Sequence, residues 1–268
     1  MNQDRKKVVS HPMIGIVGGL GPEAGRLFHG YVIEETSRMK PVHVDQDHID
    51  VIHFSLSSMI PDRASYVWGK IQENPADEVF RILSLMAASA QHLNRHMYAI
   101  VPCNTFHAPR LFEPLLEKVQ KASFASHLTL LNMIDESVGY IKKLYPEIQK
   151  VGVLGTNTTH RTGIYETALK KHTIELVPLR PDLQDGVEES IYHPDYGLKA
   201  LSYASDKARQ HLLSAVQQLQ GEDVKHIILG CTELPLAFPT QSIPGVELID
   251  AGRACAARLI DLVLSSNN

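Results

Sequence analysis

The chain has 268 residues, of which 44% are hydrophobic and 21% charged, and its formal net charge is −4. This length suits one large domain or two smaller ones. Because no basic run is present, nucleic acid is a poor candidate partner. The longest apolar runs are far too short to cross a bilayer, so we also expect no membrane partner.

The cysteines and histidines narrow the expected class of protein further. Three cysteines do not make a disulfide framework, and the N-terminal segment lacks the apolar stretch of a signal peptide, so a cytoplasmic location is expected. The 14 histidines are scattered, and the pair His92 and His96 has no third ligand near it in sequence. We therefore predict no metal site.

Apolar, strand-like runs alternate with helix-like stretches along the chain. The predicted strands are 13–18, 49–55, 97–102, 128–133, 151–155, 174–178, 226–230 and 246–250. The predicted helices are about 22–39, 75–95, 108–122, 134–145, 161–171, 198–220 and 251–264. This alternation predicts an α/β protein with parallel sheets and helical crossovers.

The order of these elements indicates two similar halves. Gly18 and Cys103 each end a strand in the first half, and Gly155 and Cys231 do so in the second. We predict two doubly wound, Rossmann-like lobes, related by a pseudo-twofold axis, around a central cleft. The expected boundaries assign 1–127 and 243–268 to lobe one, and 128–242 to lobe two.

Two cysteines follow predicted buried strands, in AIVPCNTFHAP at Cys103 and IILGCTELPLA at Cys231. The carboxyl ends of parallel strands border the crevice where α/β proteins bind ligands. The polar residues that follow favour a site over a core position, and they are Asn104, Thr105, Thr232 and Glu233. A thiol before a helix N-terminus would also have its thiolate stabilised. Cys255, in an apolar helical pattern, is predicted to lie in the core.

Two thiols on opposite sides of a cleft suit the inversion of a stereocentre. One thiolate takes a proton from a carbon while the other thiol delivers one to the opposite face. The sequence has no Cys-x-x-Cys motif or Cys/His spacing of a zinc site. A lone nucleophilic cysteine with His107 or His226 as its base stays open as an alternative.

The segment GIVGGLGPEAG loosely matches a dinucleotide-binding fingerprint through Gly19 and Gly21. The acidic residue that such a site needs would be Asp45 or Asp47. The glycines equally allow backbone N–H groups to meet a carboxylate. We prefer the carboxylate because the chain offers no second nucleotide feature, and keep a nucleotide-binding protein that uses the Gly18–Gly21 turn as an alternative.

Two further loops carry candidate binding groups. Arg63, in IPDR after the second predicted strand, either pairs with Asp62 or clamps a substrate carboxylate with two hydrogen bonds. The turn LGTNTTHRTG carries Thr156, Asn157, Thr158 and Thr159, of which Thr156 and Thr158 are the chosen candidates. Its hydroxyls either cap a helix or donate to a substrate carboxylate.

VPCNTFH and ILGCTELP resemble the two cysteine signatures of the aspartate/glutamate racemase superfamily. GIVGGLGPEA, DQDH, IPDR, GIYE and LID resemble its aspartate racemase branch, and the resemblance covers nearly the whole chain in order. It implies a cofactor-independent racemase or isomerase, with two Rossmann-like lobes around a cleft. A homodimer is also implied by resemblance alone.

The resemblance implies Cys103 and Cys231 as acid/base thiols and Arg63 as the partner of a side-chain carboxylate. The groups implied to hold the α-carboxylate and amino group are those of Asn104, Thr105, Thr158 and Thr232. Lys199, in IYHPDYGLKA, is the expected counterpart of a substrate-binding lysine. Glutamate racemases have an Asp in the first glycine turn and a His after the second Cys-Thr, whereas this chain has no Asp at 18–22 and has Glu233.

We therefore expect a racemase of a small amino acid, with aspartate foremost, that needs neither pyridoxal phosphate nor metal. Within the superfamily, the alternatives are a hydantoin racemase or a maleate isomerase type of enzyme. A non-catalytic ligand-binding relative is a further alternative. The partner implied in each case is a small molecule.

Overall fold

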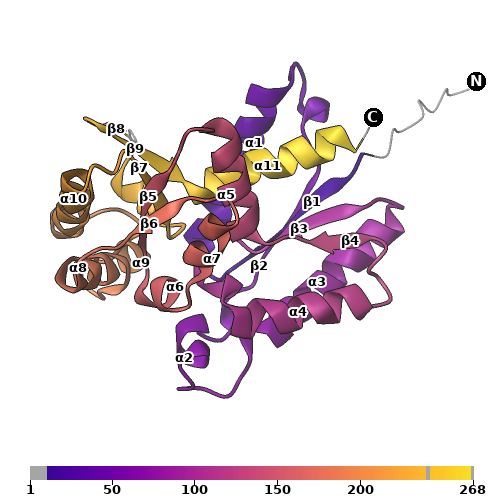
Figure 1. The fold of residues 1–268 in the computed structure, drawn as a ribbon. Coiled ribbons are helices and arrows are strands. Elements are labelled where there is room, and N and C mark those ends of the chain that lie inside the picture. The colour runs from indigo at the N-terminus through magenta and orange to yellow at the C-terminus, as the bar shows by residue number, and fades with distance from the viewer. Residues whose placement is uncertain (1–10, 240–241, 267–268) are drawn as a thin grey trace, which may run out of the picture.

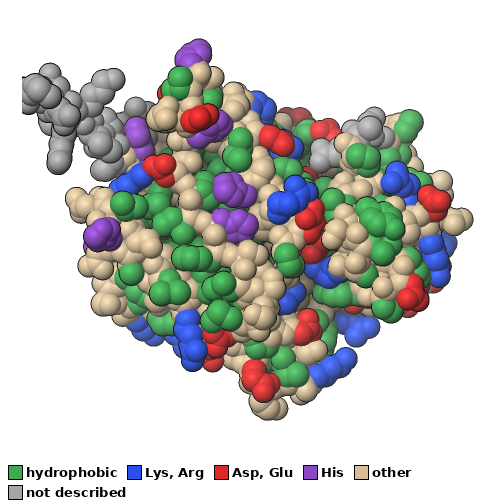
Figure 2. All heavy atoms as spheres, turned by 180° about the vertical axis from the view of Figure 1, so that it is seen from behind, with side chains coloured by type: hydrophobic (Ala, Val, Ile, Leu, Met, Phe, Trp, Pro, Cys, Tyr) green, Lys and Arg blue, Asp and Glu red, His purple; other side chains and the backbone are tan. Residues whose placement is uncertain are grey.

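The computed structural model describes residues 11–239 and 242–266, which form two mainly parallel sheets with helices between and outside them (Figure 1). This confirms the predicted α/β class with two lobes. Within the described residues, no helix is long and apolar enough to span a membrane. On the face shown in Figure 2, Lys and Arg side chains lie interspersed with Asp and Glu side chains.

The first sheet has four parallel strands in the order β2-β1-β3-β4. The strands are β1 (Met13–Gly18), β2 (Val51–Ser55), β3 (Met97–Ile100) and β4 (Leu128–Leu130). The accompanying helices are α1 (Pro22–Met39), α2 (Arg63–Val67), α3 (Pro75–His92) and α4 (Pro109–Lys121). Short 3-10 helices occur at Asp45–Asp47, Ser57–Met59 and Asn104–His107.

The second sheet has the order β6-β5-β7-β9-β8, in which only the short β8 is antiparallel. The strands are β5 (Lys150–Gly155), β6 (Glu175–Val177), β7 (His226–Gly230), β8 (Ser242–Ile243) and β9 (Val246–Asp250). The helices are α5 (Met133–Leu144), α6 (Asn157–Arg161), α7 (Ile164–Lys170), α8 (Pro181–Tyr192), α9 (Leu198–Leu201), α10 (Asp206–Gly221) and α11 (Ala251–Ser265), with a 3-10 helix at Leu234–Ala237.

The four parallel strands of each sheet have the same order: second, first, third, fourth. The chain therefore changes direction across the sheet between β1 and β3, and again between β5 and β7. Crevices at the carboxyl ends of strands form at such switch points. The repeated order places the turns after β1, β3, β5 and β7 where a ligand site is expected.

The helices α1, α5 and α11 form a layer shared by both sheets (Figure 1). Along β1, Ile14 and Ile16 pack toward this layer, whereas Met13 and Val17 pack toward α3 and α4. The second sheet likewise packs its outer face against α8 and α10. Because both faces of each sheet are covered, the central strands are mostly apolar, as is typical of parallel sheets.

The sheets do not follow the expected division of the chain at two places. Leu128–Leu130, expected in lobe two, pairs with β3 at the edge of the first sheet. Val246–Asp250, expected in lobe one, pairs with β7 in the second sheet. The last helix, α11, then packs against both α1 and α5, so it joins the two halves.

Polar residues and a glycine explain where the observed helices differ from the predicted ones. The expected helix 198–220 is two helices, because Ser202 adopts a left-handed conformation after α9 and the Ser205 hydroxyl caps α10 by accepting from the Ala208 N–H. The helix α8 was not predicted, since its acidic residues and Gly186 obscure the apolar periodicity.

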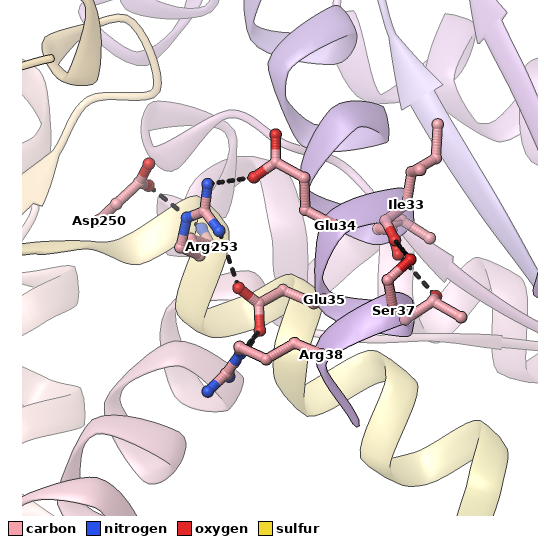
Figure 3. A network of polar contacts seen from close by, with 9 residues as sticks. Ile33, Glu34, Glu35, Ser37, Arg38, Asp250 and Arg253 are labelled. Atoms are coloured by element: carbon pink, nitrogen blue, oxygen red, sulfur yellow. Dashed lines mark hydrogen bonds and ion pairs between the residues drawn. The ribbon is translucent and has the colours of Figure 1, made fainter. Parts of the chain in front are cut away.

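An ion-pair network centred on the buried Glu35 fixes α1 against α11 (Figure 3). Arg253 on α11 donates to the Glu35 carboxylate at 2.8 Å and also to Glu34. Arg38 donates to the same Glu35 at 2.5 Å, and Glu35 is only 2% exposed. A buried carboxylate requires such partners. The helix that starts at the glycine turn is thereby held in place.

We predict that Arg253→Met lowers the free energy of unfolding by about 1–3 kcal/mol, because Glu35 then keeps a single charged partner. Urea denaturation of both proteins measures this loss. Lys170→Met, which removes the exposed ion pair with Glu166, is the control and should cost about 1 kcal/mol or less. Equal losses in the two variants would contradict the structural importance of the network.

Candidate active site

Cys103 and Cys231 follow β3 and β7, the equivalent third strands of the two sheets. Their residues are 9% and 6% exposed, respectively. Both cysteines lie near Tyr192 of α8, whose pKa is raised by burial and further by the negative charge that either thiolate would carry. The fold thus brings the two cysteines toward one common side chain.

A pocket of about 470 Å³ lies between the two halves of the molecule. From the first half it is lined by residues 19–23, Arg26 and Arg63, and from the second by Leu198, Lys199, Ser202 and Glu233. It therefore combines four of the predicted binding residues, which are Gly19, Arg63, Lys199 and Glu233. Two of these side chains, Glu233 and Arg63, connect the pocket to Cys231 and Cys103.

Glu233 is the direct partner of Cys231. The Cys231 thiol donates to Glu233 Oε2 at 3.1 Å, and the Thr232 hydroxyl donates to the same oxygen at 3.3 Å. The other carboxylate oxygen accepts from the ammonium of Lys199. A buried chain of thiol, carboxylate and ammonium results.

Electrostatics in this chain favour a protonated Cys231. Burial raises the pKa of Cys231 well above its ordinary value, and the Glu233 charge raises it further, while Lys199 acts in the opposite direction. This differs from the stabilised thiolate expected before a helix N-terminus, because burial and a neighbouring anion outweigh the helix. Burial opposes ionisation of Glu233, but Lys199 outweighs it and lowers the pKa of Glu233.

Arg63 faces the other thiol. One Nη of its guanidinium donates to the Leu20 carbonyl at 2.5 Å. Burial tends to lower the pKa of Arg63, but the charge and hydrogen bonding of Cys103 help to raise it. Asp62 caps α2 by accepting from the Ser65 N–H at 2.7 Å. Arg63 is thus directed to the site, and its Nε is buried without a partner among the described residues.

Three threonine hydroxyls from the two halves meet beside Cys103. Thr105 Oγ1 lies 3.2 Å from Thr156 Oγ1 and 3.4 Å from Thr159 Oγ1, and the last two lie 3.0 Å apart. Thr156 also caps α6 through the Thr159 N–H. Sequence reasoning placed Thr159 in the hydroxyl-rich turn but chose only Thr156 and Thr158 as binding residues, although the spacing of Thr159 from the capping Thr156 was a usable signal. Thr158 turns elsewhere and accepts from the Trp68 indole at 3.0 Å.

The side-chain amide of Asn104 has a defined orientation. Tyr165 on α7 donates its hydroxyl proton to Asn104 Oδ1 at 2.7 Å. Burial raises the pKa of Tyr165 well above its usual value, so the phenol stays a donor. Asn104 Nδ2 is buried and has no partner among the described residues. Buried donors normally have an acceptor, and a ligand carboxylate would supply one here.

Neither candidate histidine is placed to serve a cysteine as its base. His107 Nε2 accepts from the Met133 N–H at 3.1 Å, so Nδ1–H donates to the Cys103 carbonyl at 3.0 Å. Burial lowers the pKa of His107 to about 4, which keeps the ring neutral. His226 begins β7, whereas Cys231 follows its end, roughly 16 Å away. Within the described residues, no group of three His, Cys, Asp or Glu side chains would hold a metal ion.

The glycine turn makes room for protein groups. Gly19 has φ of +89°, and a Cβ there would lie 2.8 Å from the Leu56 nitrogen. A Cβ on Gly21 would lie 2.5 Å from Glu233 Oε1. A diphosphate at the start of α1 would therefore meet a carboxylate. Asp45 and Asp47 precede β2, so they lie at the amino ends of the parallel strands, whereas the glycine turn follows the carboxyl end of β1. The nucleotide-binding alternative therefore has no support here.

The chain is similar to several known racemases. The structure of Picrophilus torridus aspartate racemase has a TM-score of 0.70 and 25% identity, and the match covers 94% of each chain. The broad specificity amino-acid racemase RacX of Bacillus subtilis is 24% identical over 83% of this chain and 86% of that protein. Glutamate racemase of Enterococcus faecalis is 35% identical over 109 residues, which span only 36% of that enzyme.

The family model described as Asp/Glu/Hydantoin racemase matches residues 17–259. This range includes every strand of both sheets except the start of β1, both strand-end cysteines and all the residues that line the pocket. The chain therefore belongs to the Asp/Glu/hydantoin racemase family.

Proposed function

We propose that the protein racemises a small acidic amino acid, with aspartate as the first candidate. The observation that carries this proposal is the placement of Cys103 and Cys231 after equivalent strands, with Arg63 beside the first thiol. The likeness to an aspartate racemase supports the choice of an acidic substrate. No step of the proposed reaction requires pyridoxal phosphate or a metal.

The two thiols have opposite electrostatic surroundings. Cys103 faces the guanidinium of Arg63, and Cys231 faces the carboxylate of Glu233. In one direction, the Cys103 thiolate takes the Cα proton and the Cys231 thiol delivers its own proton to the opposite face. Cys103 is then the thiol and Cys231 the thiolate, which is the state that the reverse reaction requires.

Different polar groups around Cys103 suit different parts of the substrate. Asn104 Nδ2 and the hydroxyls of Thr105, Thr156 and Thr159 suit the α-carboxylate, since they supply several donors in one place. Arg63 suits a side-chain carboxylate. Lys199 is already paired with Glu233, so its role is to balance charge near Cys231 more than to bind the substrate directly.

The two-thiol mechanism predicts that Cys103→Ser and Cys231→Ser each lower the racemisation rate of aspartate about a hundredfold or more. Circular dichroism of single enantiomers, without added cofactors, measures the rate. Cys255→Ser is the control, because Cys255 is fully buried in the core as predicted and lies outside the pocket. In deuterated water, the product should carry deuterium at Cα from the first turnover. Full activity of either site variant would refute the mechanism.

The buried chain of Cys231, Glu233 and Lys199 predicts that replacing Glu233 and replacing Lys199 shift the pKa of Cys231 in opposite directions. In a Cys103→Ser, Cys255→Ser background, Glu233→Gln removes the anion that raises the pKa of Cys231, so iodoacetamide alkylation should begin at lower pH. Lys199→Met removes the cation that lowers this pKa, so alkylation should begin at higher pH. The pH dependence of the alkylation rate measures both.

Arg26→Met is the matched control for this pair, because Arg26 lines the same pocket but pairs with Glu23 at the surface. It should leave the alkylation profile in place. Shifts of the same sign in Glu233→Gln and Lys199→Met would show that Cys231 does not respond to these charges.

The role given to Arg63 predicts a change in substrate preference. Arg63→Leu should lower kcat/KM for aspartate about ten- to a hundredfold, as expected for the loss of a hydrogen bond to a charged group. Arg63→Lys should retain only part of the wild-type kcat/KM for aspartate, because an ammonium lacks the planar fork of a guanidinium. Activity on alanine, which has no second carboxylate, should change little. Equal losses on aspartate and alanine would remove Arg63 from substrate recognition.

A further inference from the structure

The segment between β2 and α3 contains α2 and packs against the first half of the molecule. Its side chains Leu56, Tyr66 and Val67 contact the apolar cluster that includes Cys103. Arg63, the first residue of α2, reaches from this segment to the thiol. Figure 1 shows α2 outside the layers of both sheets, next to α6. The position of Arg63 therefore depends on what holds this segment.

Trp68, directly after α2, makes a contact to the other half of the molecule. Its indole N–H donates to Thr158 Oγ1 on α6 at 3.0 Å, and the guanidinium of Arg161 lies 5.8 Å from the ring centre. Trp68 is 44% exposed, whereas Thr158 is 3% exposed. Burial in the core does not hold such an exposed ring, so the specific contacts do.

We propose that Trp68 is a positioning residue: its hydrogen bond to Thr158 holds α2 across the cleft and so keeps Arg63 against Cys103. Trp68 follows Arg63 by five residues, and both lie on one short, rigid segment capped by Asp62. From the first half, Arg110 holds the same segment by donating to the Val67 carbonyl at 2.9 Å. The indole adds a hydrogen bond to the second half, and we call this Trp68–Thr158 bond the tie.

This proposal assigns Thr158 a different task from that of Thr156 and Thr159. The latter two hydroxyls bond to each other and to Thr105, beside the substrate pocket. The Thr158 hydroxyl instead serves the indole. One turn of α6 then serves both the substrate and the segment that carries Arg63. The inference rests on the proposed function for its effect on substrate choice, but the tie itself is testable without activity.

The activity-independent test measures how fast iodoacetamide alkylates Cys103 in a Cys231→Ser, Cys255→Ser background. Trp68→Phe keeps the ring and loses the N–H donor, and Thr158→Val keeps the shape and loses the acceptor. Each should raise the alkylation rate about fivefold or more. The double variant should match the single ones, because all three break the same bond.

Thr162→Val is the matched control, since its hydroxyl also lies at α6 but bonds only within that turn, to the carbonyls of Thr158 and Thr159. It should leave the alkylation rate unchanged. Unchanged rates in Trp68→Phe and Thr158→Val would overturn the proposal. Additive effects of the two substitutions would overturn it as well, because they would show that the two groups act independently.

The second measurement compares kcat/KM for aspartate and alanine. Trp68→Phe and Thr158→Val should lower the ratio of aspartate to alanine activity about fivefold or more, mainly through KM, because Arg63 is less well placed. A merely structural role would lower both activities equally. Wild-type protein without racemase activity would contradict the proposed function, and the alkylation rates would still decide whether Trp68 forms the tie.

Trp68 is the single tryptophan of the chain, so its fluorescence reports this position alone. Thr158→Val should increase quenching of this fluorescence by acrylamide, because the indole is freed from α6. Thr162→Val should not change it. Equal quenching in wild type and Thr158→Val would count against the tie, independently of both other measurements.

Discussion

The buried carboxylate of Glu233 is the constraint on which the site depends. It accepts from the Cys231 thiol and the Lys199 ammonium, and it lies where a side chain at Gly21 would have to be. An ionised carboxylate is stable at 2% exposure only because these partners replace water. Its presence requires a glycine in the first turn and a lysine on α9, and it raises the pKa of the thiol after β7. Groups from both halves are therefore matched to one another around a single charge.

The repeated strand order brings one cysteine from each sheet to an equivalent position. The charged groups that surround the two thiols nevertheless have opposite sign. Arg63 faces Cys103, and Glu233 faces Cys231. Two identical environments would favour the same protonation state at both thiols. A two-base inversion needs one acid and one base at a time, so similar backbone positions with different neighbours fit this chemistry.

The two halves are held together on both sides of the pocket. Behind it, Arg253 joins α11 to the buried Glu35 of α1, and the central helices share one apolar cluster (Figure 3). On another side, buried hydroxyls of Thr105 and Thr156 meet between the two halves, and the amide of Asn104 meets Tyr165. Apolar contacts supply most of the attraction, whereas these directional bonds fix orientation. Small shifts of one half would therefore disturb the pocket.

The sequence by itself determined the α/β class, most strand positions, the strand-end cysteines and four of the residues that line the pocket, because apolar periodicity and turn residues act locally. Tertiary structure decided that 128–130 and 246–250 join the opposite sheets from those expected, since strand pairing depends on distant partners. It also decided that the Thr159 hydroxyl meets Thr105 while the Thr158 hydroxyl meets Trp68. The protonation of Cys231 likewise depends on burial and on Lys199, which folding alone brings near.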